Sequence, residues 1–458
     1  MDELAAEAIG VLRTNDRGTW TRPSPRLYPH QWSWDAGFVA IGWAHFAPRR
    51  AVTELRSLLR GQWANGMVPH IVFDRSVALG AYEPRHTTWA TAGLCPPHVA
   101  TSGICQPPVH AIALARVRAV AERRDDGTVR EVDAAIAELY PRLAAWHRWL
   151  HTARDPDGTG LVTVFHPWES GLDNSPRWDH ALAAVTIDEQ TAGARPDLAH
   201  VTDAAQRPTD DEYRRYHTLV RELVDVGHDA ARAHRRHPFR IADVLFTAIL
   251  AAADDALVDL ALLAGHPAAA AGHRSDAELS RRGLDACWDP VRCACLDRDL
   301  VADRWITADT IAGFAPLVAG CDVDRAEALV ARLTGPSYAG AEGLRWPVPP
   351  TTAVDDPAFD PRSYWRGPTW PVITWLLWWA LDREGRRTQA EALRQAAITQ
   401  LRDTGCCEYS HPLTGEAMGS GAQSWTAAVA LDWLAEDAGD PGINPPATGL
   451  RNTVERRP

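Results

Sequence analysis

A carboxylic acid set in a turn between two tryptophans is the first candidate for chemistry in this sequence. Asp173 lies in HPWESGLDNSPRWD (residues 166–179), and the Asn-Ser-Pro that follows it favours a tight turn that projects the side chain. Trp168 and Trp178 would desolvate the carboxyl group. Desolvation raises a carboxyl pKa toward neutrality, where the group can serve as a general acid. The alternative is an Asx-turn in which Asp173 only caps its own loop.

A second candidate, Glu408, lies in the glycine-rich segment CCEYSHPLTGEAMGSGAQSW (residues 406–425). Hydrolysis of a glycoside needs one carboxylic acid to protonate the leaving oxygen and one carboxylate to act as base or nucleophile. Asp173 and Glu408 together predict this chemistry, with Glu169 and Asp179 as rivals for the acid. The alternative for Glu408 is an ordinary glutamate in a surface loop.

Aromatic and polar side chains gather in neighbouring segments, as a sugar-binding wall requires. The chain holds 20 Trp against 8 Tyr and 8 Phe, and flat rings pack on the apolar faces of sugars. Asp35 could accept paired hydrogen bonds from neighbouring sugar hydroxyls; the alternative is a capped helix start with buried tryptophans. The candidate wall comprises Tyr28, Trp32, Trp34, Asp35, Gln106, Tyr364, Trp365, Trp370 and Gln423.

Charge and composition exclude several classes of function. A net charge of −12 offers no basic face to phosphates, so we expect no nucleic-acid partner. All 47 basic residues are arginine, which excludes a lysine Schiff base and a P-loop lysine. No cofactor or metal is indicated. His234 and His237 have an HxxH spacing, but the basic run AHRRHPF around them favours a solvated helix end.

We expect a cytoplasmic chain. Its acidic, amphipathic start, MDELAAEAIGVLRTND, lacks the features of a signal peptide, and no apolar run approaches the roughly 20 residues that span a bilayer. The 8 cysteines lack paired CxxC spacing, which favours reduced, buried thiols over disulfides or a zinc site. The sequence does not fix the oligomeric state, and a homo-oligomer is compatible with it.

The elements that must position these residues are helical. Apolar residues recur at helical spacing, with no strand framework, which is typical of an all-α toroid. Thr209 and Glu212 have capping-box spacing, and prolines at 107–108 and 371 mark further helix starts. Short strand ladders are expected near 161–166 and 345–348. The expected helices cover residues 2–13, 35–46, 48–63, 108–124, 130–153, 209–227, 240–264, 275–287, 307–319, 324–333, 371–383, 386–402 and 422–436.

One catalytic domain is expected over residues 1–440, followed by a flexible tail at 441–458. Long loops at about 68–106, 155–208 and 335–370 should cover the mouth of the site. Long loops without secondary structure are usually functional in a compact domain, and these hold many of the candidate residues.

Seven segments together resemble glycoside hydrolase family 63, in its bacterial branch acting on glucosylglycerate and mannosylglycerate. They run in the family's order from about residue 27 to about residue 435. The matching strings are LYPHQWSWDAGFVAIG, QWANGMVPHIVF, TSGICQPPVHAIA, WESGLDNSPRWD, AQRPTDDEYRRY, YWRGPTWPV and the segment from Glu408 that ends QSWTAA.

The resemblance implies an (α/α)6 barrel and an inverting mechanism. Asp173 matches the family's general acid, and Glu408 matches the general base that activates a water on the opposite face of the sugar. Inverting carboxyl pairs are expected roughly 6.5–9.5 Å apart. The positions that hold the glucose ring are matched by Tyr28, Trp32, Trp34, Asp35, Gln106, Trp365, Trp370 and Gln423.

The resemblance also implies a glycerate aglycone. Arg207 and Tyr213 match the positions that grip the glycerate carboxylate, and Tyr82 is expected in the same cap. The chemistry fits, because arginine offers a planar fork to a carboxylate and tyrosine adds one donor. The alternative is an ordinary loop arginine paired with a neighbouring aspartate.

The hypothesis is an inverting α-glycosidase that hydrolyses a small molecule, 2-O-α-D-glucosyl-D-glycerate, to glucose and D-glycerate. Mannosylglycerate or another small α-glucoside is the nearest alternative substrate. A sugar epimerase that uses histidines such as His30, His70 and His110 is a more distant alternative. The sequence departs from the family pattern at the two cysteines before Glu408 and over 265–303, so the substrate within the branch stays open.

Overall fold

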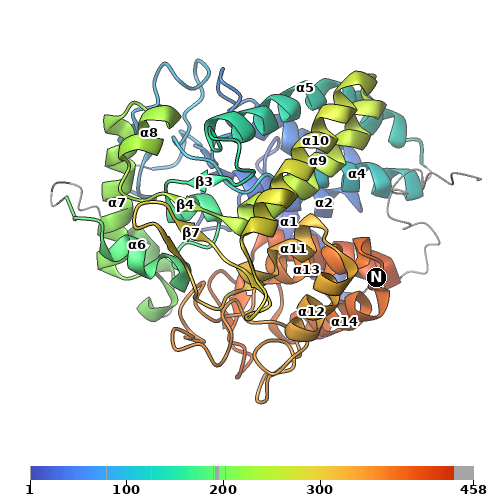
Figure 1. The fold of residues 1–458 in the computed structure, drawn as a ribbon. Helices are drawn as coiled ribbons and strands as arrows, with labels where there is room; N and C mark the ends of the chain where they lie inside the picture. The colour runs from blue at the N-terminus through green and yellow to red at the C-terminus, as the bar shows by residue number, and fades with distance from the viewer. Residues whose placement is uncertain are drawn as a thin grey trace, which may run out of the picture.

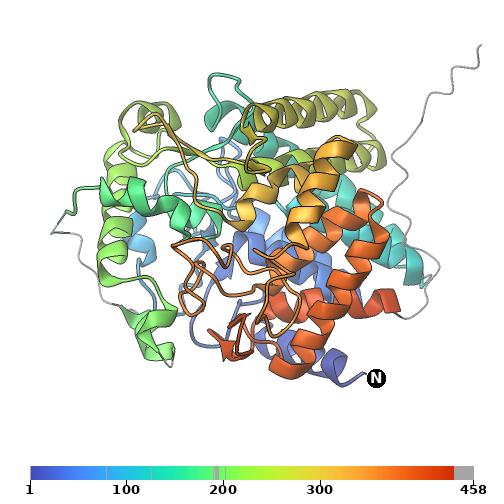
Figure 2. The same ribbon diagram turned by 60° about the horizontal axis from the view of Figure 1, so that its bottom comes forward.

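The computed structural model describes residues 2–78, 80–124, 126–188, 190, 195–201 and 203–437. The tail expected at 441–458 lies outside these residues. Helices pack side by side through most of the molecule, and the loop-rich part that includes α6, α7 and α8 lies to one side of them (Figures 1 and 2). The chain forms the expected (α/α)6 barrel.

Six helices form the inner ring of the barrel. Each contacts the next one along the chain, and the last returns to contact the first. All 12 residues of the first inner helix are buried, and a helix covered on every side needs apolar residues all round. The inner helices are α2 (Ser33–Ala44), α4 (His110–Arg124), α9 (Val244–Leu263), α11 (Ala315–Ala319), α13 (Pro371–Arg383) and α15 (Ser424–Asp437).

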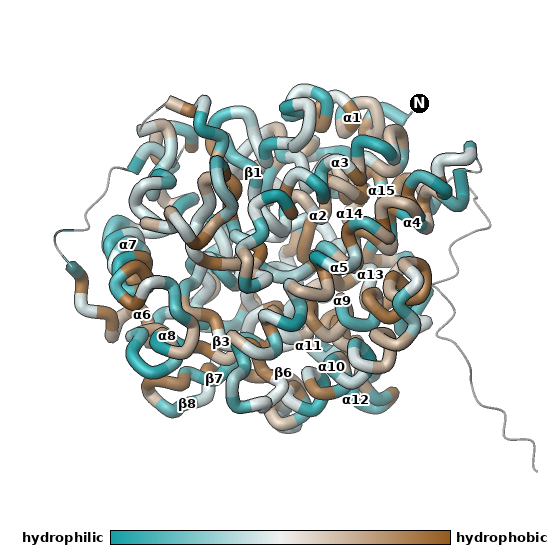
Figure 3. Tube along the Cα trace, turned by 90° about the horizontal axis from the view of Figure 1, so that it is seen from above, coloured by the Kyte–Doolittle hydropathy of each residue, from teal (hydrophilic) through white to brown (hydrophobic). Residues whose placement is uncertain are grey.

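Outer helices alternate with the inner ones along the chain and pack on their outward faces. They bury one face only, so hydrophilic and hydrophobic segments alternate along the tube in Figure 3. The outer helices are α1 (Glu3–Asn15), α3 (Pro48–Leu59), α5 (Val129–Ala153), α10 (Pro267–Ala286), α12 (Val323–Leu333) and α14 (Arg387–Thr404).

Short elements fill the connections at one end of the barrel. A four-stranded antiparallel sheet has the order β3-β4-β7-β8. The further helices are α6 (Asp179–Ala183), α7 (Asp210–Asp225) and α8 (Ala230–Arg236). The strands are β1 (Gln31–Trp32), β2 (Ile71–Val72), β3 (Thr163–Val164), β4 (Ile241–Ala242), β5 (Trp288–Asp289), β6 (Ala294–Cys295), β7 (Arg298–Asp299), β8 (Arg304–Trp305), β9 (Tyr409–Ser410) and β10 (Ala417–Met418).

Most expected helices are confirmed, and so are their start signals. The capping box of Thr209 and Glu212 forms at the start of α7, and Pro371 is the first residue of α13. The helix expected over 240–264 begins only at Val244, because residues 241–242 pair as β4. The strand ladder expected near 161–166 is confirmed by β3.

Four expectations are wrong. The helix expected over 307–319 is a 3-10 turn followed by the short α11, because Thr310 is extended and pairs with Thr352. The helix expected over 275–287 starts earlier, at Pro267. No strand occurs at 345–348, a stretch that the structure describes throughout. The small helices and strands of the connections were missed, since elements of two to seven residues leave little periodicity to detect.

The cysteines are all free, as expected. Five are buried, whereas Cys95, Cys293 and Cys321 are partly exposed, so the expectation of burial is wrong for these three. Among the described residues, the search for a helix long and apolar enough to cross a membrane finds none.

A close approach between α2 and α15 closes the inner ring. A Cβ atom added at Gly42 would lie 2.5 Å from the Cα atom of Ala428, so the two helices meet without space for a side chain. We expect Gly42→Ala to lower the free energy of unfolding by about 1–3 kcal/mol, because the helices must separate. Urea denaturation measures this change.

The matched control is Gly10→Ala in α1, where the added Cβ atom has nothing within 4 Å. The same substitution there should be neutral or stabilising by about 0.5–1 kcal/mol, because alanine is the better helix former. Equal effects at the two glycines would contradict the packing argument.

Candidate active site

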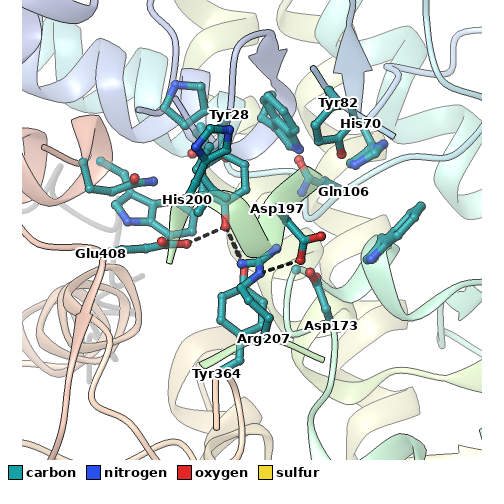
Figure 4. A pocket seen from close by; sticks show the side chains of 18 of the residues that line it. Tyr28, His70, Tyr82, Gln106, Asp173, Asp197, His200, Arg207, Tyr364 and Glu408 are labelled. Atoms are coloured by element: carbon teal, nitrogen blue, oxygen red, sulfur yellow. Dashed lines mark hydrogen bonds and ion pairs between the residues drawn. The ribbon is translucent and has the colours of Figure 1, made fainter. Parts of the chain in front are cut away.

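A cavity opens at the end of the barrel where the inner helices begin (Figure 4). It encloses about 770 Å³ of empty space, a volume that includes open solvent at its mouth. The expected site residues that line it are Tyr28, Trp32, Trp34, Asp35, Tyr82, Gln106, Asp173, Arg207, Tyr213, Tyr364, Trp365, Glu408 and Gln423.

The starts of the inner helices position several of these side chains. Asp35 lies in the first turn of α2, Gln106 shortly precedes α4, and Gln423 immediately precedes α15. Because the N-terminal end of a helix carries a partial positive charge, this end of the barrel favours anionic groups. Both side-chain polar atoms of Gln423 are buried and have no hydrogen-bond partner among the described residues, so they are available to a polar ligand.

Asp173 enters the cavity from the turn that follows the 3-10 helix Pro167–Ser170. Burial raises the pKa of its carboxyl group to about 7, with the Arg207 guanidinium acting against burial and the Glu408 carboxylate acting with it. The backbone carbonyl of Asp173 accepts a hydrogen bond from the Tyr216 hydroxyl at 2.9 Å, which fixes the turn. The arrangement therefore keeps a carboxylic acid protonated up to about neutral pH.

Glu408 lies directly before β9 and is fully buried. Its Oε1 atom accepts a hydrogen bond from the Tyr28 hydroxyl at 2.7 Å, and its Oε2 atom accepts one from the Ser420 backbone N–H at 3.0 Å. Burial raises the pKa of Glu408, while Arg207 and these two donors oppose the rise. A Cβ atom at Gly419 would lie 2.4 Å from Oε2, so only glycine leaves room for the carboxylate.

The two carboxyls enter the cavity from different sides, with Tyr28 and Arg207 between them in the view of Figure 4. Asp35 adds a third carboxyl at the base of the site. Burial raises the pKa of Asp35 well above its usual value, and the charges of Glu408 and Asp173 act in the same direction. Burial and the repulsion between these carboxyls therefore favour protonation within the cluster, most directly of Asp173, whose pKa is about 7.

Arg207 is the cation beside these carboxyls. Its Nη1 atom donates to the Tyr28 hydroxyl at 2.9 Å, and its Nε atom donates to Asp197 at 3.2 Å. The guanidinium also lies over the Tyr364 ring, 4.4 Å from its centre. The expected alternative, an arginine paired with a neighbouring aspartate, is thus realised through Asp197, but Arg207 also lines the cavity with Tyr213.

The rivals for the acid are held in structural ion pairs. Glu169 accepts hydrogen bonds from both terminal nitrogens of Arg154, with Nη1 at 2.8 Å, and from the backbone N–H of Phe165 at 2.7 Å. Asp179 accepts two hydrogen bonds of 2.7 Å from Arg366. Both carboxylates are satisfied by arginine, and neither lines the cavity.

The aromatic wall is close-packed. Trp34 passes so near the backbone that a Cβ atom at Gly171 would lie 2.7 Å from its ring. Trp370 was expected to line the sugar site, and this is wrong. Its ring is fully buried and stacks on the rings of Trp365 and Tyr409, with 3.5 Å and 4.4 Å between ring centres. Trp370 is the residue immediately before α13 and is buried, so it supports the wall without lining the cavity.

Several lining residues were not expected in the wall. Those with polar or aromatic side chains are His70, Glu83, Trp168, Asp197, His200 and Trp425. His70, Trp168 and Trp425 lie in the strings that carried the resemblance, so the sequence held a signal for them. Asp197 and His200 lie in ARPDLAH, where no spacing or motif marks them, and only the fold brings them to the site.

The histidines of the epimerase alternative do not form a proton-transfer pair in the described lining. His30 and His110 lie outside it, and burial lowers the pKa of His70 to about 3, which leaves the ring neutral. The solvated helix end expected at His234 and His237 is wrong for His237. That ring is buried and bonds the backbone carbonyls of Phe239 and Leu219, because the chain turns inward before β4.

An (α/α)6 barrel with buried carboxyls in an aromatic cavity at the loop end defines a glycoside hydrolase. Residues 28–426 match the family model described as the mannosylglycerate hydrolase MGH1-like glycoside hydrolase domain. The chain belongs to this family, within glycoside hydrolase family 63, as the sequence resemblance implied.

Named relatives resemble the chain over nearly its whole length. The glucosylglycerate hydrolase of Mycolicibacterium hassiacum is 44% identical over 94% of this chain and 98% of that protein. The mannosylglycerate hydrolase of Rubrobacter radiotolerans is 40% identical over 95% and 98%. A crystal structure of GH63 mannosylglycerate hydrolase from Thermus thermophilus, in complex with Tris and D-glycerate, has a TM-score of 0.85 at 37% identity and covers 94% of this chain and 100% of that chain.

The free energy of unfolding should distinguish the structural role of Glu169 from the place of Asp173 in the cavity. We expect Glu169→Gln to lower the free energy of unfolding by about 3–5 kcal/mol, because it leaves the buried charge of Arg154 without its partner. Urea denaturation measures the loss.

Asp173→Asn is the matched control, measured at about pH 8, where the native carboxyl is ionised. Its folded pKa of about 7 lies above the 3.8 of an unperturbed aspartic acid, so ionising Asp173 costs the folded state stability as the pH rises, and the amide removes that cost. We expect unchanged or slightly higher stability. A large loss in Asp173→Asn would contradict the assignment of the two roles.

Proposed function

We propose that the chain is an inverting α-glycosidase that hydrolyses 2-O-α-D-glucosyl-D-glycerate to glucose and D-glycerate. The observation that carries the proposal is the position of Arg207, whose buried guanidinium lines the same cavity as Asp173 and Glu408. A cation beside the reacting carboxyls favours a substrate with an anionic aglycone. Its planar fork suits a carboxylate, and the Tyr213 hydroxyl adds a donor beside it.

In the proposed reaction Asp173 is the general acid. It donates its proton to the glycosidic oxygen as the bond to the anomeric carbon breaks, so glycerate leaves with a neutral hydroxyl. Its pKa of about 7 supports this role, because a carboxyl with the usual pKa would be ionised at neutral pH.

Glu408 is the proposed general base. It takes a proton from a water molecule as the water oxygen attacks the anomeric carbon on the face opposite the leaving group, which inverts the configuration. The hydrogen bonds from Tyr28 and Ser420 support this role, because they favour the ionised form of a buried carboxylate. Entry of the two carboxyls from different sides is compatible with room for the water between them.

The proposed sugar is glucose, held by the aromatic wall, by Asp35 and by the polar atoms of Gln106 and Gln423. The named relatives include a glucosylglycerate hydrolase at 44% identity and a mannosylglycerate hydrolase at 40% identity, so mannosylglycerate is the second candidate. The two hexoses differ at one hydroxyl group, which the wall must recognise. The cytoplasmic location and the oligomeric state stay predictions from the sequence.

Activity should fall as the pH rises through about 7. The reason is that Asp173 must carry its proton, and its raised pKa sets the alkaline limit of turnover. Initial rates across the pH range measure this fall on the alkaline side, the alkaline limb of the pH profile. We expect Asp173→Asn to lower kcat by at least about 10³-fold and to abolish the alkaline limb, because the amide cannot donate the proton. Wild-type activity that stays constant well above neutrality would refute this role for Asp173.

The substrate and the stereochemistry can be tested in one experiment. We expect NMR of the wild-type reaction with glucosylglycerate to show β-glucose as the first-formed anomer, because inversion turns the α-linkage into β-glucose. Mannosylglycerate is the comparison substrate. First-formed α-glucose would overturn the inverting mechanism, and faster release of mannose than of glucose would favour the second candidate.

A further inference from the structure

A continuous line of hydrogen bonds joins Arg207 to Glu408 through Tyr28 (Figure 4). Arg207 Nη1 donates to the Tyr28 hydroxyl at 2.9 Å, and that hydroxyl donates to Glu408 Oε1 at 2.7 Å. Arg207 and Glu408 are buried, with 6% and 0% of their surfaces exposed, so solvent screens their interaction weakly. The charge of Arg207, the proposed partner of the aglycone, therefore acts on Glu408, the proposed base, through two consecutive hydrogen bonds.

The Tyr28 hydroxyl donates its single proton to Glu408. A tyrosine hydroxyl has one hydrogen, and the carboxylate of Glu408 can only accept. The Tyr28 oxygen therefore accepts from Arg207, and the Tyr364 hydroxyl, which lies 2.9 Å away and also contacts Glu408, can donate to it as well. Donors that point at this oxygen polarise the O–H group and strengthen the hydrogen bond that it donates to Glu408.

Arg207 can contact a ligand without leaving Tyr28. A guanidinium has five N–H groups. Within the described residues, its hydrogen bonds to Asp197, Tyr28 and Tyr213 use three of them, one on each nitrogen. One N–H on each terminal nitrogen then remains for the paired hydrogen bonds that a carboxylate accepts. A ligand carboxylate can thus neutralise Arg207 while the line to Glu408 stays in place.

We propose that Tyr28 is a positioning residue that couples occupancy of Arg207 by an aglycone carboxylate to the basicity of Glu408. The inference rests on the proposed function, since it takes Arg207 as the partner of the aglycone and Glu408 as the base. With a neutral aglycone, the full charge of Arg207 strengthens the Tyr28–Glu408 hydrogen bond and makes the glutamate a weaker base. A carboxylate on Arg207 offsets that charge, so Glu408 takes the proton of water more readily.

The consequence is a preference for acidic over neutral aglycones that appears in the chemical step. A simple binding pocket for glycerate would raise affinity and lower KM without changing kcat. Coupling through Tyr28 instead makes an acidic aglycone raise kcat as well. Arg207 also acts on Asp173, whose pKa it lowers. At about pH 6 that acid is mainly protonated with either aglycone, so a difference in kcat measured there reports on Glu408.

The test compares glucosylglycerate with 2-O-α-glucosylglycerol, which has the same linkage and no carboxylate. At about pH 6 we expect wild-type kcat to be about 10- to 100-fold higher for glucosylglycerate, the range that a charge-assisted hydrogen bond can supply. In Tyr28→Phe the ratio of the two kcat values should fall to within about threefold, because the line to Glu408 is cut. Tyr364→Phe is the comparison variant: it removes a hydroxyl that contacts Tyr28 and Glu408, and it should leave the ratio above about threefold, since the Arg207–Tyr28–Glu408 bonds remain.

A second variant distinguishes coupling from damage to the fold. Arg207→Gln removes the charge that strengthens the Tyr28–Glu408 bond, so we expect it to raise kcat on glucosylglycerol by about threefold or more while raising KM for glucosylglycerate. A folding defect would instead lower kcat on both substrates.

The coupling is overturned if Tyr28→Phe lowers both kcat values by the same factor, or if the wild-type preference lies in KM alone. It is also overturned if Arg207→Gln lowers kcat on glucosylglycerol. A wild-type enzyme that does not hydrolyse glucosylglycerate would instead overturn the proposed function. Turnover of glucosylglycerate with an unchanged ratio in Tyr28→Phe would leave that function intact and remove only the role of Tyr28.

Discussion

The constraint on which the rest of the structure depends is the burial of three carboxyls around one guanidinium. Asp35, Asp173 and Glu408 line a cavity where burial raises the pKa of each, and Arg207 is the cation placed among them. Such a cluster is tolerated only if the groups differ in protonation and each ionised group finds donors. Asp173 meets this condition by keeping its proton, and Glu408 meets it through hydrogen bonds from Tyr28 and Ser420.

The double ring of helices supplies the setting for this cluster. The first inner helix, α2, is buried on every side, and the inner helices begin at the end of the barrel where the cavity lies, so their N-terminal ends bring partial positive charge toward the carboxyls. Carboxylates that serve the fold are treated differently. Glu169 is saturated by Arg154 and backbone N–H groups, and Asp297 by Arg177 and the backbone N–H of Val244. The oxygens of these two carboxylates are satisfied within the fold, whereas the carboxyls of Asp173 and Glu408 line the cavity.

Arg207 links recognition to reactivity in the proposed enzyme. It is held from one side by Asp197 and reaches Tyr28 on the other, so its charge acts on the aglycone, on the acid and on the base at once. Burial makes each of these effects larger than it would be in water. An anionic aglycone then does more than fit the cavity, because it also changes the electrostatics of the whole cavity.

Local sequence determined much of this protein. Apolar spacing, the capping box at Thr209 and the proline at the start of α13 predicted most helices, because these signals act over a few residues. Ordered strings carried the family and most of the cavity lining. Only the tertiary structure decided which carboxyl next to a tryptophan faces the cavity, since Asp173 and Glu169 are four residues apart and have opposite surroundings. It also placed Trp370 behind the wall and brought Asp197 to Arg207. Those outcomes depend on packing between residues distant in the chain, which local spacing does not encode.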